Sequence, residues 1–390
     1  MTRRDLTLFG TALVLAVGTA TAQVPLAEDS VYRFIDELKS TLPDADSDVF
    51  QSPGPAQLDA FVDCFESVLL DDRPTALACL PPLGFELRLL SDPSAGRDYL
   101  VVQEAPGDPR GRGVYIVDPD FRRHLAVVAP HPLHDTNTPE ATITHFRDLG
   151  ARVFMMAGTH RCSSADLSGC DGSTGACSPD SAPFRVSDLA HATEHYLQAA
   201  HLSLLRLDPV PVVFNFHGNS SEPVAAIVSD GTRDPASPLA LVNRLRESLL
   251  HREVTTASCN WPPDDVFGVR FCGITNTQGR LMNSSPEHCT EGAGSASGRF
   301  IHLEQYRFLR DDPALMGTVL RETLRATEVD LRVRKQDGDV ILEWTGSRAP
   351  YLVRSGSDPR LRVTPLEVTV PMGTLHLEAL AGGTRFYLVD

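Results

Sequence analysis

One stretch in the middle of the chain decides the fold: HLAVVAPHPLHDTNTPEATITHFRDLGARVFMMA, residues 124–157. Its first residues, 124–129, predict a buried strand. A helix is predicted to begin at Thr138-Pro139-Glu140. Threonine is a favourable N-cap, proline fits the first turn because no N–H is hydrogen-bonded there, and glutamate interacts well with the positive end of the helix dipole. Gly150 ends this helix, and 152–157 predict a second buried strand. Strand, helix and strand in this order are the unit of a parallel sheet.

The same alternation continues on both sides of this stretch. It predicts an α/β fold with a mixed, mostly parallel sheet and helices on both faces. Further strands are expected at 85–90, 99–103, 212–216, 225–228 and 300–303, and helices at 31–42, 57–70, 187–207, 237–251 and from 312 onward.

The pattern changes near Val329, where short apolar–polar alternation replaces the helices. Turn residues separate the alternating runs, which predicts a small C-terminal all-β sandwich over 329–390. Ile341-Leu342-Glu343-Trp344 and the closing Phe386-Tyr387-Leu388-Val389 resemble a fibronectin type III domain. We expect 116–328 to form the main α/β domain, and 23–115, a helical and β segment, to be part of it.

The first 22 residues have the zones of a removable signal peptide. Arg3 and Arg4 precede a short apolar core, and Ala20-Thr21-Ala22 supplies small residues for cleavage before Gln23. The two arginines also fit a twin-arginine signal, so the general secretory and twin-arginine routes both stay open. We expect a periplasmic or extracellular protein, with no transmembrane segment once the signal is removed.

Eight cysteines in an exported chain predict disulfides. Close spacing suggests Cys64–Cys79, Cys170–Cys177 and Cys259–Cys272, which leaves Cys162 with Cys289, although spacing alone does not fix the pairing. The net charge of −16 argues against nucleic acid as a partner.

Polar clusters follow three predicted strands, where the sites of α/β sheets gather. His131 and Asp135 follow the strand 124–129, His217 follows 212–216, and Glu304 follows 300–303. Any single histidine at a strand end is often structural, but the joint placement favours a metal site. Two histidines and a carboxylate on zinc leave a position for water, whose pKa the metal lowers to about 7. Glu304 would then take the proton of this water.

These motifs resemble those of the zinc carboxypeptidase-like hydrolases, with the poly-γ-glutamate hydrolase and N-formylglutamate amidohydrolase branches nearest. The resemblance rests on His131 with Asp135-Thr136-Asn137-Thr138-Pro139-Glu140, on Phe216-His217-Gly218 and on Glu304. It implies a carboxypeptidase/phosphorylase-like fold, one zinc ion on His131, Asp135 and His217, and Glu304 as base. The chain departs from the pattern at Asp135, where the poly-γ-glutamate branch has glutamate. This leaves His134 as a substitute ligand.

Other polar residues are candidates for supporting roles. Arg161, Asn276 and Arg280 are candidate binding groups for a substrate carboxylate, although the arginines would also pair with carboxylates of this acidic chain. Asp188 and His191, in the first turn of the expected helix, are candidates to orient a metal-bound histidine.

Residues 191–195 offer a rival metal motif, since they spell H-x-x-E-H. It is the weaker hypothesis, because on a helix His195 would face solvent. Serine catalysis has little support, since Ala296 stands where a G-x-S-x-G motif needs serine.

The sequence therefore predicts an exported zinc-dependent hydrolase that cleaves a peptide or glutamyl-type amide bond in a small peptide or acidic amide. The alternative is a secreted binding protein with an inactive hydrolase-like domain, which Asp135 and the fibronectin-like module both allow.

Overall fold

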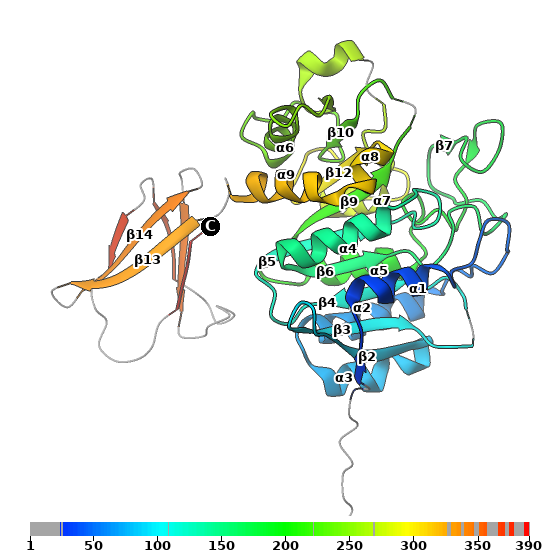
Figure 1. Cartoon of the computed structure of the whole chain (residues 1–390), viewed down its shortest axis with the longest axis horizontal. Helices are drawn as coiled ribbons and strands as arrows, with labels where there is room; N and C mark the ends of the chain where they lie inside the picture. The colour runs from blue at the N-terminus through cyan, green and yellow to red at the C-terminus, as the bar shows by residue number, and fades with distance from the viewer. Residues whose placement is uncertain are drawn as a thin grey trace, which may run out of the picture.

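The computed structural model describes residue 24, residues 26–107, 109–220, 222–267 and 270–325, and six strand segments between 329 and 389. Its centre is a ten-stranded sheet (Figure 1). In spatial order the strands are β1 (Leu26–Glu28), β2 (Phe85–Asp92), β3 (Arg97–Glu104), β4 (Val114–Val117), β6 (Ala151–Met156), β5 (Arg123–Ala129), β9 (Val212–Gly218), β12 (Phe300–Gln305), β10 (Ala226–Ser229) and β11 (Thr256–Ser258).

The four central strands, β6, β5, β9 and β12, are parallel to one another. Their carboxyl ends therefore meet at one edge of the sheet. On one side β2, β3 and β4 form an antiparallel extension, and on the other β10 is antiparallel to β12. The predicted α/β class with a mixed, mostly parallel sheet is confirmed.

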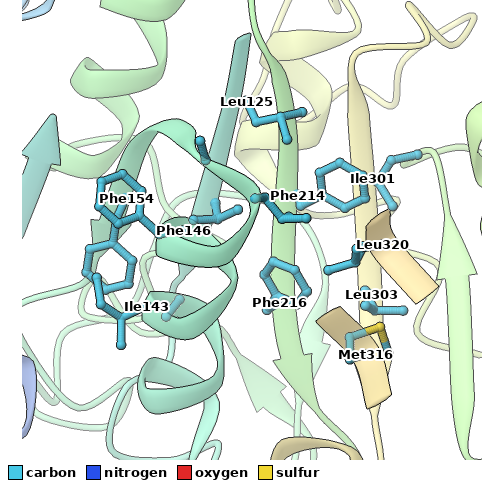
Figure 2. Packing of buried hydrophobic residues seen from close by; sticks show 14 of the residues in the cluster. Leu125, Ile143, Phe146, Phe154, Phe214, Phe216, Ile301, Leu303, Met316 and Leu320 are labelled. Carbon is cyan, nitrogen blue, oxygen red and sulfur yellow. The ribbon is translucent and has the colours of Figure 1, made fainter. Parts of the chain in front are cut away.

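Helices cover both faces of the sheet, because the strand residues alternate between two apolar cores. Val127, Phe154 and Phe214 belong to the first core, whereas Val128 and Met155 belong to the second. Figure 2 shows the first core, in which side chains of α4 and α9 pack against β9 and β12. On the first face lie α1 (Val31–Lys39), α4 (Thr138–Leu149), α6 (Leu241–Leu250), α8 (Arg307–Asp311) and α9 (Pro313–Arg325); on the second lie α2 (Pro55–Leu69), α3 (Arg73–Cys79), α5 (Tyr196–Leu205) and α7 (Thr277–Met282).

The C-terminal strands form two three-stranded antiparallel sheets, ordered β13-β14-β17 and β16-β15-β18. Their packing as a sandwich and the fibronectin type III resemblance stay predictions. Their bounds are β13 (Val329–Gln336), β14 (Asp339–Gly346), β15 (Tyr351–Gly356), β16 (Leu366–Val370), β17 (Thr374–Leu377) and β18 (Phe386–Val389). The predicted signal peptide lies outside the described residues. Within them, no helix combines the length and apolarity needed to cross a membrane.

The helix predicted over 187–207 is wrong at its start, since α5 begins only at Tyr196. The residues before it lie in turns because their side chains are engaged elsewhere. Asp188 binds His131 and Arg161, and the Ser187 hydroxyl donates to the Arg161 carbonyl. His195, which we expected to face solvent, is buried and caps α5 by accepting from the Gln198 N–H at 3.1 Å.

All eight cysteines are in disulfides, and two of the four predicted pairs are confirmed, Cys64–Cys79 and Cys259–Cys272. The other two are wrong, since the bonds are Cys162–Cys177 and Cys170–Cys289. Proximity in the fold outweighs spacing here. The Asp171 N–H donates to the Cys289 carbonyl at 3.2 Å, which holds the neighbouring Cys170 beside Cys289.

His145 of α4 gives the fold a pH-sensitive point. Its ring packs on Phe216 at 5.2 Å, and neither ring nitrogen has a hydrogen-bond partner. Burial lowers its pKa to about 3, so below pH 6.5 the unfolded chain takes up a proton that the folded chain refuses. We expect this group to cost about 1.4 kcal/mol of unfolding free energy per pH unit on acidification from pH 6.

Urea unfolding of chelator-treated protein between pH 4 and pH 7 measures this dependence. In the variant His145→Leu the loss of stability with acid should be shallower by about one proton's contribution. Identical pH slopes in the variant and the wild type would contradict the assignment.

Candidate metal centre

Three buried side chains converge at the carboxyl edge of the central strands. His131 and Asp135 lie in the turn after β5, and His217 lies near the end of β9. The Asp135 N–H donates to the His131 carbonyl at 2.9 Å, so the chain makes one turn that returns Asp135 to the side of His131. The Gly218 N–H donates to Asp135 Oδ2 at 3.0 Å and ties this turn to β9. We call His131, Asp135 and His217 the ligand triad.

The triad atoms form a small triangle. His131 Nδ1 lies 3.3 Å from Asp135 Oδ2 and 3.2 Å from His217 Nδ1, and His217 Nδ1 lies 3.6 Å from Asp135 Oδ2. Tetrahedral zinc with bonds of about 2.0–2.1 Å places its ligand atoms about 3.3–3.4 Å apart. The triangle therefore has the dimensions of three corners of a zinc site.

Proton positions point the same way. His131 Nε2 lies 2.9 Å from Asp188 Oδ1 and donates to this carboxylate, so Nδ1 is the nitrogen that faces His217 and Asp135. A buried imidazole nitrogen, a second imidazole nitrogen and a carboxylate oxygen can lie this close only around a cation or a shared proton. These residues therefore form a buried group that can bind a metal ion.

Charge prepares two triad members for metal binding. Burial lowers the pKa of His217 to about 4, so its imidazole is neutral at pH 7. Burial raises the pKa of Asp135, but His131 and His217 outweigh it and hold that pKa well below its usual range. Burial and Arg161 lower the pKa of His131, whereas Asp188 and Asp135 raise it above its usual value on balance. The metal would replace the proton at His131.

Asp188 binds the ring nitrogen of His131 that faces away from the other two triad residues. From the sequence we expected it to orient a metal-bound histidine. It is fully buried and receives His131 on one oxygen and the Arg161 guanidinium on the other, with Arg161 Nε at 3.0 Å. Arg161 lines the cavity, but its charge is engaged by Asp188 rather than being directed at a substrate.

Glu304 lies beside His217, because the two are register partners in the parallel β9–β12 ladder. The sequence predicted Glu304 just after a strand ending at 303, but Glu304 lies within β12. Burial and the charge of Asp135 raise its pKa well above the usual range. Sequence reasoning missed His302, two residues earlier on the same face of β12, with Nε2 3.7 Å from Glu304 Oε1 and its ring 4.5 Å from His217. The His-x-Glu alternation in a strand was the available signal.

A cavity of about 570 Å³ opens onto the triad, Glu304 and His302. Its walls include residues 173–176, which begin with the short strand β7 (Ser173–Thr174), the loop 270–275, and Phe184 and His191. His134 also lines the cavity, but its ring contacts His160 and it lies outside the groups of the described chain that could hold a metal ion, which favours Asp135 over His134 as the expected ligand.

Three further candidates lie apart from the triad. Asn276 caps α7 by accepting from the Gly279 N–H, and Arg280 binds Asp171 and the Cys289 carbonyl; neither lines the cavity. His191 lines the cavity but does not orient a ligand, since its Nδ1–H donates to the Thr275 carbonyl and its ring lies 6.5 Å from that of His131. The rival H-x-x-E-H motif fails, because residues 191–195 form turns and His195 caps α5.

No family model and no curated protein matches this chain. Among solved structures it is similar to gene product Atu2144 from Agrobacterium tumefaciens, with 9% identity and a TM-score of 0.33, over 52% of this chain and 88% of that one. It is also similar to a zinc-free apo form of YNDL, with 13% identity and a TM-score of 0.29, over 54% of this chain and 89% of that one. Both similarities are weak, and the metal centre rests on the residues of this chain.

The triad predicts stoichiometric metal binding. Purified protein should hold about one zinc per chain, and His217→Ala should hold none, because two ligands bind zinc far more weakly than three. Elemental analysis with circular dichroism measures metal content and folding together. His134→Ala is the matched control and should retain zinc. Zinc lost from His134→Ala and kept by His217→Ala would contradict the ligand assignment.

Asp188 should set the zinc affinity without binding the ion. Asp188→Asn removes the charge that orients His131, so we expect the zinc affinity to fall by about 10–100-fold. Competition with a chromogenic chelator measures this change. Asp171→Asn, which alters a carboxylate paired with Arg280 away from the triad, should leave the affinity unchanged. Equal losses in both variants would point to a general effect of charge.

Proposed function

We propose that the protein is a zinc-dependent hydrolase that cleaves an amide bond, of the peptide or glutamyl type, through a water molecule. The observation that carries this proposal is the triangle of His131, Asp135 and His217, with Glu304 beside His217. When bound, zinc supplies a position for water and lowers its pKa to about 7.

The protein's own residues divide the remaining work. His131, Asp135 and His217 hold the metal, and Asp188 fixes the tautomer of His131. Glu304 takes the proton of the attacking water and returns it to the leaving amine. A group that shuttles a proton should have a pKa near the working pH, and burial moves Glu304 in that direction.

The proposed setting is outside the cytoplasm. Four disulfides support an oxidising compartment, the periplasm or the extracellular space, as does the predicted signal peptide. A small peptide or an amide substrate would reach the metal centre through the cavity.

Glu304→Gln separates catalysis from metal binding. The amide keeps the size of the side chain but cannot take a proton, so we expect kcat to fall by about 10²–10⁴-fold while zinc content is unchanged. Hydrolysis of a panel of peptide and glutamyl amides measures kcat. Unchanged activity in Glu304→Gln would remove the assigned base. A zinc-loaded wild type that cleaves no member of the panel would favour the alternative, a secreted binding protein.

A further inference from the structure

Two exposed apolar side chains lie at the cavity. Phe271 is 46% exposed and Ile274 is 41% exposed, and both line the cavity. We call this pair the apolar rim. Exposed apolar area that borders a polar cavity is typical of a surface that a ligand covers.

The loop that carries the apolar rim is held firmly against the metal centre. The Cys259–Cys272 disulfide ties it to the segment after β11, and the Ser229 hydroxyl donates to the Cys272 carbonyl at 2.7 Å. Gly273 has φ +67°, and a Cβ there would lie 2.8 Å from ring atoms of His302. The backbone therefore packs directly on His302, whose ring contacts His217. Gly273, which lies between the two rim residues in the chain, is thus separated from His217 by the His302 ring.

An aromatic stack also lines the cavity, in which Phe184 is buried and His191 is half-buried. The Phe184 ring stacks on the His191 ring at 3.9 Å with an angle of 4°, and both line the cavity. His191 Nδ1 donates to the carbonyl of Thr275 at 3.0 Å, next to Ile274. The aromatic stack and the rim loop therefore form one wall.

The cations of the cavity are engaged within the protein. Arg161 is bound to Asp188, and Arg270 is bound to Glu222 through Nε at 2.9 Å and Nη2 at 2.7 Å. Arg233, the third arginine of the lining, also has interactions within the chain. At the rim itself, the Arg270 guanidinium lies 5.4 Å from the Phe271 ring centroid, and its charge is already paired with Glu222.

From this wall we infer that the substrate is an amide whose neighbouring side chain is apolar, leucine-like or aromatic, and that Phe271 and Ile274 determine this specificity. The inference rests on the proposed function and narrows its substrate class. The side chain packs on the rim while the scissile carbonyl lies at the ligand triad.

The zinc-loaded wild type and the double variant Phe271→Ala, Ile274→Ala are compared as hydrolases of four substrates. These are the N-acetyl amino acid amides of phenylalanine, leucine, glutamate and glycine. In the wild type, kcat/KM for the phenylalanine and leucine amides should exceed the glutamate and glycine values by about tenfold or more. The double variant should lose about tenfold on phenylalanine and leucine, chiefly in KM, with glycine and zinc content unchanged. Phe308→Ala, which removes an exposed phenylalanine of α8 outside the cavity, should change nothing.

A wild-type preference for glutamate, or an equal loss on all four substrates, would overturn the inference. If no substrate is cleaved, the proposed function fails and calorimetry decides the inference separately. Wild type that binds N-acetyl-phenylalanine amide at least about tenfold more tightly than the double variant, and more tightly than N-acetyl-glutamate amide, supports the apolar subsite. Equal binding by the two proteins refutes it.

Discussion

The structure depends on one constraint, the need to hold three acceptor atoms within 3.6 Å of one another in a buried site. Two imidazole nitrogens and a carboxylate oxygen repel one another there unless a cation or a shared proton joins them. Only a rigid frame can hold them without that cation. The parallel pairing of β5 with β9 and the hydrogen bond from Gly218 to Asp135 provide this frame.

The charges around the triad argue for a divalent ion. Asp135, Asp188 and Glu304 are buried carboxyl groups, and two positive groups lie beside them, Arg161 bound to Asp188 and Arg310 near Asp135 and Glu304. If all were ionised, three negative charges would face two positive charges and leave an excess of negative charge in the buried site. Without a metal the site holds protons instead: burial and then the charge of Asp135 raise the pKa of Glu304, and, against the effect of burial, Asp188 and Asp135 raise the pKa of His131. A divalent cation would neutralise the same imbalance.

The sequence predicts the site residues that lie in or next to the parallel strands. It misses the contacts that loop residues make with residues distant in the chain. The strand-helix-strand pattern around residues 124–157 predicts the parallel centre of the sheet. Because the carboxyl ends of parallel strands meet at one edge, His131, His217 and Glu304 are then expected to lie together. No periodicity shows that Asp188 would bind across the chain, so its helix was misplaced. For the same reason Arg161 and Arg280 were interpreted as substrate groups, although their charges are engaged by Asp188 and Asp171. The Cys170–Cys289 bond, which spans 119 residues, is long-range in the same way, and it leaves Cys177 to pair with Cys162.

The two parts of the cavity are stabilised by different means. The ligand triad rests on strands that two large apolar cores hold in place, and most of this sheet needs no crosslink. Much of the cavity wall lies in loops outside the two large cores, and three of the four disulfides close segments there, Cys162–Cys177, Cys170–Cys289 and Cys259–Cys272. Crosslinks reduce the loop entropy that little apolar burial can offset in such segments. Oxidation therefore stabilises the substrate-facing part of the cavity, whereas the metal-binding part follows from the sheet itself.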